Sequence, residues 1–219
     1  MSTTERLSQE IRGLWGITAE YSITIRANPQ QECPVTIPQL RGQQLSGVVI
    51  EHPHDITQDW DTILYHEGAH TDLFCNRGYP PSELASLDNV EIIAEYYASK
   101  MELEKRFPTE YDRQARLESK VSNCYINAIN PLVGNGNLKR VAIEAALCVR
   151  ICKDWGLYNN SSWVISPNSL ENTLKIVNNP TLRIAYEKAA GILEKVPREF
   201  ERDQATRIRR LQEEWFRDP

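Results

Sequence analysis

Histidine is scarce in this sequence. Only 4 occur among 219 residues, and all of them lie between residues 52 and 70. Long apolar runs are missing too: the stretch 141–151 is interrupted by Glu144 and Arg150, and it is far shorter than the roughly 20 residues of a membrane span. The sequence therefore predicts no membrane partner, and the clustered histidines are the first sign of chemistry.

A surplus of basic residues is also missing. The chain has 25 Lys and Arg against 30 Asp and Glu, a formal net charge of -5. A surface that binds nucleic acid needs positive charge to displace counterions, so nucleic acid is not an expected partner. In the stretch 198–216 arginines alternate with acidic residues, which favours a solvated or partner-binding helix and allows an oligomer to form through the C-terminal helices.

The sequence has no CxxC pair and no apolar leader. Its 5 cysteines are scattered, which is not the pattern of a disulfide framework. The first 15 residues carry charges where a secretion signal would need an apolar run. We therefore expect a cytoplasmic protein. Cys148 and Cys152, four apart in a helical stretch, could face a metal, but buried core thiols are the favoured interpretation.

The hydropathy pattern changes from strand-like to helical along the chain. Residues 2–16 predict an amphipathic helix that ends at Gly16, and β-branched residues then predict short strands at 17–26, 35–37 and 47–51. The later pattern predicts helices at 57–74, 88–106, 110–128, 138–155, 169–177 and 181–196. A small sheet followed by many helices is an α+β fold.

Residues 66 to 70 read His66-Glu67-Gly68-Ala69-His70, the pattern HExxH. On an α-helix both imidazoles leave the same face and can hold one zinc ion. Glu67 lies beside that face, where its carboxylate can take a proton from a water molecule on the metal. Gly68 costs about 1 kcal/mol relative to Ala inside a helix, which suggests a close neighbouring backbone. The alternative is two ordinary histidines on a surface helix.

A catalytic zinc ion needs a third protein ligand, and since no histidine follows His70, that ligand must be Asp, Glu or Cys. Glu91 and Glu95 lie four apart in the next predicted helix. One could bind zinc while the other accepts the N–H of a ligand histidine. The residues alone leave open which glutamate does which. Asp88 with Glu91 could also be a helix cap, and Glu95 a solvated charge.

These motifs resemble the gluzincin metallopeptidases, in which HExxH on one helix is completed by a glutamate on the next. The spacing of 21 residues from His70 to Glu91 looks like the thermolysin pattern. EIIAEYYA, residues 91–98, is similar to the E-x-x-x-D-x-F-A segment of ImmA/IrrE-type peptidases, except that Glu95 replaces Asp and Tyr97 replaces Phe. DTILYHEGAH, residues 61–70, is similar to the segment that introduces their active-site helix. The resemblance covers about residues 45–105.

The resemblance implies a zinc metallopeptidase with Zn²⁺ as its cofactor. In it His66, His70 and Glu91 would be the metal ligands, Glu67 would be catalytic, and Glu95 would orient a ligand histidine. The implied substrate is a protein or peptide, such as a regulatory repressor. We expect residues 1–107 to form a zincin-like catalytic core, in which the sheet packs on the active-site helix and the glutamate helix. Residues 108–219 would be a helical region packed on that core.

A peptidase also needs a donor for the oxyanion of its tetrahedral intermediate. A histidine donor beyond His70 is excluded, so a tyrosine, an arginine or zinc alone must serve. Tyr79, nine residues after His70, is the first candidate, and Tyr96, Tyr97 and Tyr125 follow. Each of these tyrosines could instead have a packing role.

His52 and His54 follow the strand predicted at 47–51. In metallopeptidases of this kind the strand beside the cleft binds substrate by adding a peptide to its edge. Both histidines could line that cleft or be plain loop residues, and Pro53 between them predicts an edge position. Cys75, five residues after His70, could quench the zinc but is more simply a buried thiol.

Two further functions fit the same residues. The first is a non-catalytic zincin-fold scaffold whose C-terminal helices make the contacts. The second is a metal-dependent amidase that acts on a small substrate. Metal content and the effect of changing Glu67 separate the scaffold from an enzyme.

Overall fold

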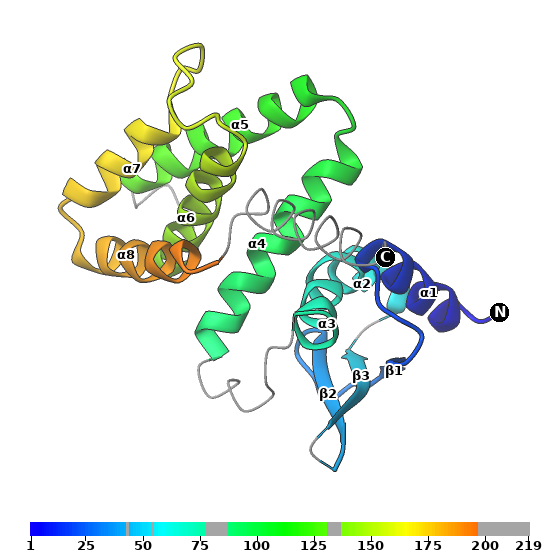
Figure 1. Ribbon diagram of the computed structural model, residues 1–219. Helices are drawn as coiled ribbons and strands as arrows, with labels where there is room; N and C mark the ends of the chain where they lie inside the picture. Colours follow the sequence, from blue (N-terminus) through cyan, green and yellow to red (C-terminus); the bar gives the residue numbers. More distant parts are fainter. Residues whose placement is uncertain (43, 54, 78–86, 131–136, 197–219) are drawn as a thin grey trace, which may run out of the picture. The chain divides into compact units, whose positions relative to one another are not determined.

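The computed structural model describes residues 1–42, 44–53, 55–77, 87–130 and 137–196. The chain divides into two compact units, Met1–Glu110 and Tyr111–Pro219. Its fold class is α+β, as predicted: a sheet of 3 strands lies near the N-terminus, and helices form most of the remaining described chain (Figure 1).

Helix α1 (Thr3–Trp15) opens the first unit and matches the prediction. It begins at a capping box, in which the Ser2 hydroxyl accepts from Glu5 N–H and the Glu5 carboxylate accepts from Ser2 N–H. It ends at Gly16, whose φ of 64° is left-handed and favours glycine. Trp15, on the apolar face, is buried.

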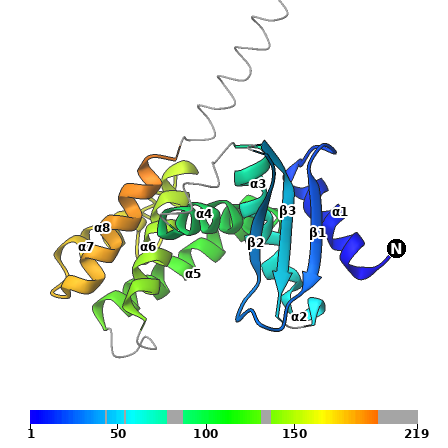
Figure 2. The ribbon, with the colours of Figure 1, turned by 90° about the horizontal axis from the view of Figure 1, so that it is seen from below.

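The sheet has β3 (Gln44–His52) at its centre, between β1 (Ser22–Ala27) and β2 (Val35–Arg41), as Figure 2 shows. β1 is parallel to β3, and β2 is antiparallel to it. The predicted strand at 17–26 starts late, because the carbonyls of residues 17, 18 and 21 accept hydrogen bonds from the Arg12 guanidinium and form a turn.

The edge position predicted beside His52 was wrong. β3 is paired along both edges, and His52 is buried at its end. The edge strands are β1 and β2. His54 lies outside the described residues.

The HExxH pattern lies in a helical run of three parts. These are α2 (Ile56–Asp61), the π-helix η1 (Thr62–Glu67) and α3 (Gly68–Cys75). The run was predicted as one uniform helix at 57–74, and the π-helical turn in its middle is the difference. Helix α4 (Leu87–Arg106) contacts both η1 and α3 and ends before Pro108, as predicted.

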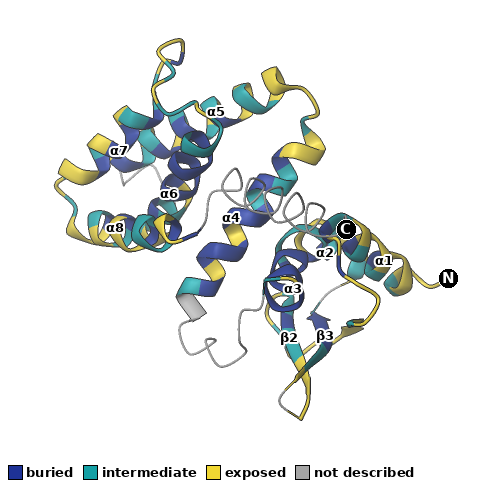
Figure 3. Ribbon diagram, viewed as in Figure 1, coloured by how far each residue is buried: buried dark blue, intermediate teal, exposed yellow. Residues whose placement is uncertain are grey.

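The second unit is helical. Its helices are α5 (Glu110–Ile129), α6 (Leu138–Asp154), α7 (Pro167–Ile176) and α8 (Pro180–Glu194). Helix α6 contacts α7 and α8 and is buried along most of its length (Figure 3). The buried Arg150 pairs with Asp154 and donates to the carbonyls of Leu193 and Val196, at the end of α8.

Cys148 and Cys152 on α6 are buried thiols, as favoured from the sequence. They belong to no cluster of the described residues that could hold a metal. The predicted stretch 198–216 lies outside the described residues. Among the helices that the structure does describe, none combines the length and the apolar character needed to cross a bilayer.

Trp15 fixes the π-helical turn to α1. Its indole Nε1 donates to the Leu64 carbonyl at 2.9 Å. The same ring lies against Gly68, where an added Cβ would be 2.2 Å from Nε1 and 2.8 Å from Cδ1. Gly68 is therefore required by a close side chain, and the neighbouring backbone inferred from the sequence was wrong.

Gly68→Ala should consequently destabilise the protein. The new methyl group cannot fit unless the indole of Trp15 leaves Leu64, and overpacking of this kind costs about 1–3 kcal/mol. Urea denaturation measures the loss in the free energy of unfolding. Gly13→Ala is the matched control, because nothing lies within 4 Å of a Cβ built there, and it should be neutral or stabilise by up to about 1 kcal/mol. Equal effects of the two changes would contradict the role of Trp15.

Candidate metal centre

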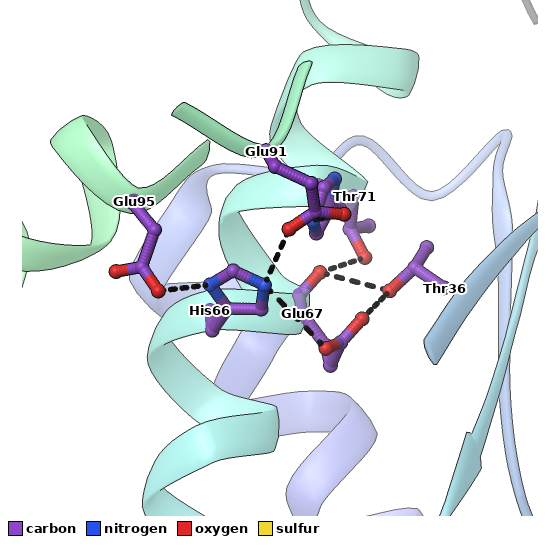
Figure 4. Close-up of polar contacts among 7 residues, drawn as sticks. Thr36, His66, Glu67, Thr71, Glu91 and Glu95 are labelled. Carbon is purple, nitrogen blue, oxygen red and sulfur yellow. Dashed lines mark hydrogen bonds and ion pairs between the residues drawn. The ribbon is translucent and has the colours of Figure 1, made fainter. Parts of the chain in front are cut away.

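The side chains of His66, His70 and Glu91 meet between the HExxH segment and α4. One oxygen of Glu91 lies 3.3 Å from His66 Nε2, and the other lies 3.3 Å from His70 Nε2. Figure 4 shows the Glu91 carboxylate above the His66 ring. One ligand atom from each residue lies within 4.8 Å of the others, and within the described chain this is the group that could hold a metal ion. The structure thus brings together the three residues predicted as metal ligands.

The donor set suits a divalent metal. Two imidazole nitrogens and one carboxylate are a common ligand set for zinc in sites that keep an open coordination position. The side chain of His70 is only 8% exposed, whereas that of Glu91 is 50% exposed. The cluster is therefore buried on the side of the HExxH segment and accessible to solvent on the side of α4.

Glu95 lies on the other edge of the His66 ring. Its Oε1 is 3.4 Å from His66 Nδ1, which is close enough for an ion pair. The geometry of a hydrogen bond is not met, and His66 Nδ1 makes no hydrogen bond to any residue that the structure describes. This is the place that the resemblance implies for a carboxylate that orients a ligand histidine. That role stays a prediction.

The carboxylates around His66 control its charge. Burial disfavours the imidazolium, but contacts with Glu91 and Glu95 outweigh burial and raise the pKa of His66 to about 10. In turn, His66 and then His70 hold the pKa of Glu91 well below its usual range. A metal ion that enters the site must therefore displace a proton from His66.

Glu67 is held at the edge of this cluster. Its side chain is 3% exposed, and its Oε1 lies 3.9 Å from His66 Nε2. Its Oε2 accepts a hydrogen bond of 2.7 Å from Thr36 Oγ1. The Glu67 main-chain carbonyl accepts from Thr36 Oγ1 at 3.2 Å and from Thr71 Oγ1 at 2.9 Å (Figure 4). Sequence reasoning missed Thr36, because no local pattern links a strand residue to a helix 31 residues later.

A cavity of about 710 Å³ opens over the cluster. Residues 31 and 33–36 line one side, ending in β2, and the α4 side chains between Glu95 and Arg106 line another. Tyr65 and Phe74 complete the wall. The site therefore lines a cavity large enough for part of a polypeptide.

Most of the remaining predicted site residues do not belong to the lining of this cavity. Tyr96 and Tyr97 are buried, with the Arg77 guanidinium 3.8 Å from the Tyr97 ring centre, and neither lines the cavity. Tyr125 belongs to α5. Tyr79 lies outside the described residues.

The lining instead includes Tyr65 and Arg106, which sequence reasoning did not single out. The Arg106 guanidinium lies 5.5 Å from the centre of the Tyr65 ring and pairs with Asp61 and Glu102. The position of Tyr65 directly before the HExxH pattern could have indicated that it lies near the site.

Two other predicted alternatives are decided by burial. His52 is buried and does not line the cavity. Cys75 is buried as well, and burial together with the nearby Asp72 raises the pKa of its thiol to about 11. A neutral buried thiol is a poor metal ligand, so the simpler interpretation of Cys75 is the one that the structure supports.

Glu51 anchors the loop that forms one cavity wall. It is buried on β3 and accepts hydrogen bonds from Asn28 Nδ2 at 2.6 Å, Arg26 Nε at 2.9 Å and Gln31 Nε2 at 3.0 Å. These bonds, led by that of Asn28, lower the pKa of Glu51 to about 2. Because Gln31 lines the cavity, the Glu51 carboxylate fixes the wall to the sheet.

Glu51→Gln should therefore change how stability depends on pH. The folded-state pKa of about 2 lies below the usual 4.5, so the stabilisation is complete above about pH 4.5 and is lost as the pH falls toward 2. The wild type should be more stable than the variant at pH 7, and the two curves should converge in acid. Urea midpoints across this range measure it, with Glu10→Gln on the exposed face of α1 as the control. A constant difference at every pH would contradict the role of the charge.

Glu91→Ala and Glu95→Ala should separate the two glutamates. Glu95→Ala should weaken zinc binding by about 10–100-fold, the typical effect of removing an orienting carboxylate. Glu91→Ala should weaken it further, because a predicted metal ligand is lost. Competition titration with a chelator measures both affinities. Glu102→Ala is the matched control, because Glu102 lines the same cavity from α4 but pairs with Arg106. The opposite order would make Glu95 the ligand.

Comparisons of the chain with family models, with curated proteins and with solved structures found no match. The resemblance to gluzincin and ImmA/IrrE-type peptidases thus stays an expectation that depends on the motifs themselves.

Proposed function

We propose that the protein is a zinc metallopeptidase that hydrolyses peptide bonds with Glu67 as its general base. The observation that carries the proposal is the cluster of His66, His70 and Glu91 at the base of a cavity, with the buried Glu67 carboxylate at its edge. A metal-ligand set alone would fit a structural site. A carboxylate that approaches the set without joining it is typical of a hydrolytic one.

In this proposal His66, His70 and Glu91 hold the zinc ion. Zinc, when bound, supplies a Lewis acid that polarises the scissile carbonyl and lowers the pKa of a water molecule toward about 7. Glu95 keeps the His66 ring in place through Nδ1, which leaves Nε2 free to act as the ligand atom. The second nitrogen ligand is Nε2 of His70, and its ring stacks on Phe74 with 6.5 Å between centroids.

The proton transfers belong to Glu67. Its Oε1 takes a proton from the water that attacks the carbonyl carbon, and then passes that proton to the amine nitrogen as the C–N bond breaks. The products are a carboxylic acid and an amine, and the remaining proton of the acid then passes to the amine to give a carboxylate and an ammonium group. Because Glu67 is buried, the oxygen that performs both transfers is shielded from bulk solvent.

The substrate of this reaction would be an extended segment of a protein. β2 is an edge strand beside the cluster, and an extended peptide can add to such an edge through main-chain hydrogen bonds. Pro34 and Pro38 offer no N–H and lie two residues on either side of Thr36, so the edge near the site can pair with a short segment only. This limited edge suits one or a few protein substrates, such as a regulatory protein.

A cytoplasmic location is part of the same proposal. All five cysteines are free thiols, as in proteins of a reducing compartment.

Glu67→Gln should keep zinc and lose turnover. The amide preserves the size of the side chain but cannot accept the proton, and general-base catalysis typically contributes about 10²–10⁴-fold. Zinc content by mass spectrometry and cleavage of a mixed-sequence library of quenched fluorescent peptides measure the two properties. Glu102→Gln in the same cavity is the control and should leave both unchanged.

Two results would overturn the proposal. The first is less than about half an equivalent of zinc in protein made with ample metal, since a preformed site of this kind should fill. The second is a Glu67→Gln variant as active as the wild type. Cleavage of a denatured proteome at many unrelated sites would contradict the restricted range of substrates alone.

A further inference from the structure

Thr36 is the contact through which the sheet reaches the HExxH segment at Glu67. It lies on β2, is 9% exposed, and donates its hydroxyl proton toward both the Oε2 atom and the main-chain carbonyl of Glu67. The shorter of these two bonds, 2.7 Å, goes to the carboxylate. In Figure 4 the two oxygens of Glu67 point in different directions, one toward Thr36 and the other toward His66.

The geometry points to Thr36 as a positioning residue that decides which oxygen of Glu67 acts as the base, an inference that rests on the proposed function. With Oε2 held by Thr36, Oε1 is the oxygen left to face the ligand cluster, 3.9 Å from His66 Nε2. That distance is too long for a hydrogen bond and short enough for strong attraction.

Without the hydroxyl of Thr36, no hydrogen bond from β2 would oppose the attraction between the Glu67 carboxylate and His66. A buried carboxylate with a free torsion would turn toward the imidazoles and add itself to the ligand set. The Thr36 hydrogen bond holds the carboxylate back, so that Oε1 stays outside hydrogen-bond distance of the His66 imidazole. Thr36 thus keeps Glu67 a base rather than a ligand.

Thr71 provides a matched comparison. It is fully buried, and its hydroxyl donates at 2.9 Å to the main-chain carbonyl of Glu67, as Thr36 also does. This bond goes to the carbonyl and not to the carboxylate. Thr36→Val and Thr71→Val therefore make the same chemical change around the same residue, and only the first removes the bond to Oε2.

The experiment compares Thr36→Val, Thr36→Ser and Thr71→Val in zinc-loaded protein, with a single quenched fluorescent peptide selected from the library. For Thr36→Val, kcat should fall at least about tenfold, as expected when a hydrogen bond to a charged group is lost. KM should change by less than about twofold, because the backbone of β2 stays in place. Thr36→Ser should recover most of kcat, and Thr71→Val should keep it.

A second measurement uses no substrate. Acetohydroxamate chelates a metal through two oxygens and gives a proton to a neighbouring base, so its affinity for the zinc-loaded protein reports the position of Glu67. Thr36→Val and Glu67→Gln should each weaken it about tenfold, and Thr71→Val should not. Zinc affinity and near-UV circular dichroism, measured alongside, show that each variant is folded and keeps its site.

The outcomes separate this inference from the proposed function. If Glu67→Gln abolishes turnover while Thr36→Val behaves like wild type or like Thr71→Val, the positioning role is wrong and the peptidase proposal stands. If Glu67→Gln is fully active, both fail. If no peptide is cleaved, the peptidase proposal fails, and an unchanged hydroxamate affinity in Thr36→Val would overturn the positioning role independently.

Discussion

The site depends on the contacts of one imidazole with three carboxylates. His66 lies 3.3 Å from Glu91, 3.4 Å from Glu95 and 3.9 Å from Glu67. Three carboxylates gathered this closely repel one another, and a protonated imidazole among them offsets that repulsion. Burial disfavours the protonated imidazole, but the pKa of His66 is raised because these carboxylates favour that form more strongly. Because the carboxylates come from η1 and α4, the same interaction also sets how these two helices pack.

The elements around the cluster hold it from several sides. Trp15 on α1 bonds to the π-helical turn just before His66, and Thr36 on β2 bonds to Glu67 just after it. Glu51 on β3 secures the loop that leads into β2. Each of these supports is a buried or half-buried hydrogen bond with at least one partner on a helix or strand, and such contacts hold side chains precisely.

The parts of this structure that sequence reasoning predicted are those set by near neighbours in the chain. The first helix with its end at Gly16, the other helix boundaries and the HExxH spacing all depend on residues within one or two turns. The position of Glu91 opposite both histidines was implied by the family resemblance, because the helical period alone left Glu91 and Glu95 as equal candidates. The catalytic roles stay predictions.

The features that were missed depend on residues far apart in sequence. Gly68 is required by Trp15, and no pattern in the chain reveals that a specific indole crosses a specific helix. The central place of β3 follows from a parallel pairing with β1, which separates chain order from sheet order. The π-helical turn arises in a segment whose hydropathy suits an α-helix equally well. In each case the local sequence allows several conformations of similar free energy, and tertiary packing determines which of them forms.

β2 illustrates how one strand can serve both binding and chemistry. In the proposed function its outer edge is the surface to which an extended peptide adds, and the side chain of Thr36 projects from the same strand to Glu67. In that proposal a displacement of β2 would move the peptide-binding edge and Glu67 together, so the distance between them is preserved. The hairpin between β2 and β3 and the anchor at Glu51 both restrict that displacement. The small sheet is therefore part of the catalytic apparatus in the proposed function, and more than a support beneath the helix that carries HExxH.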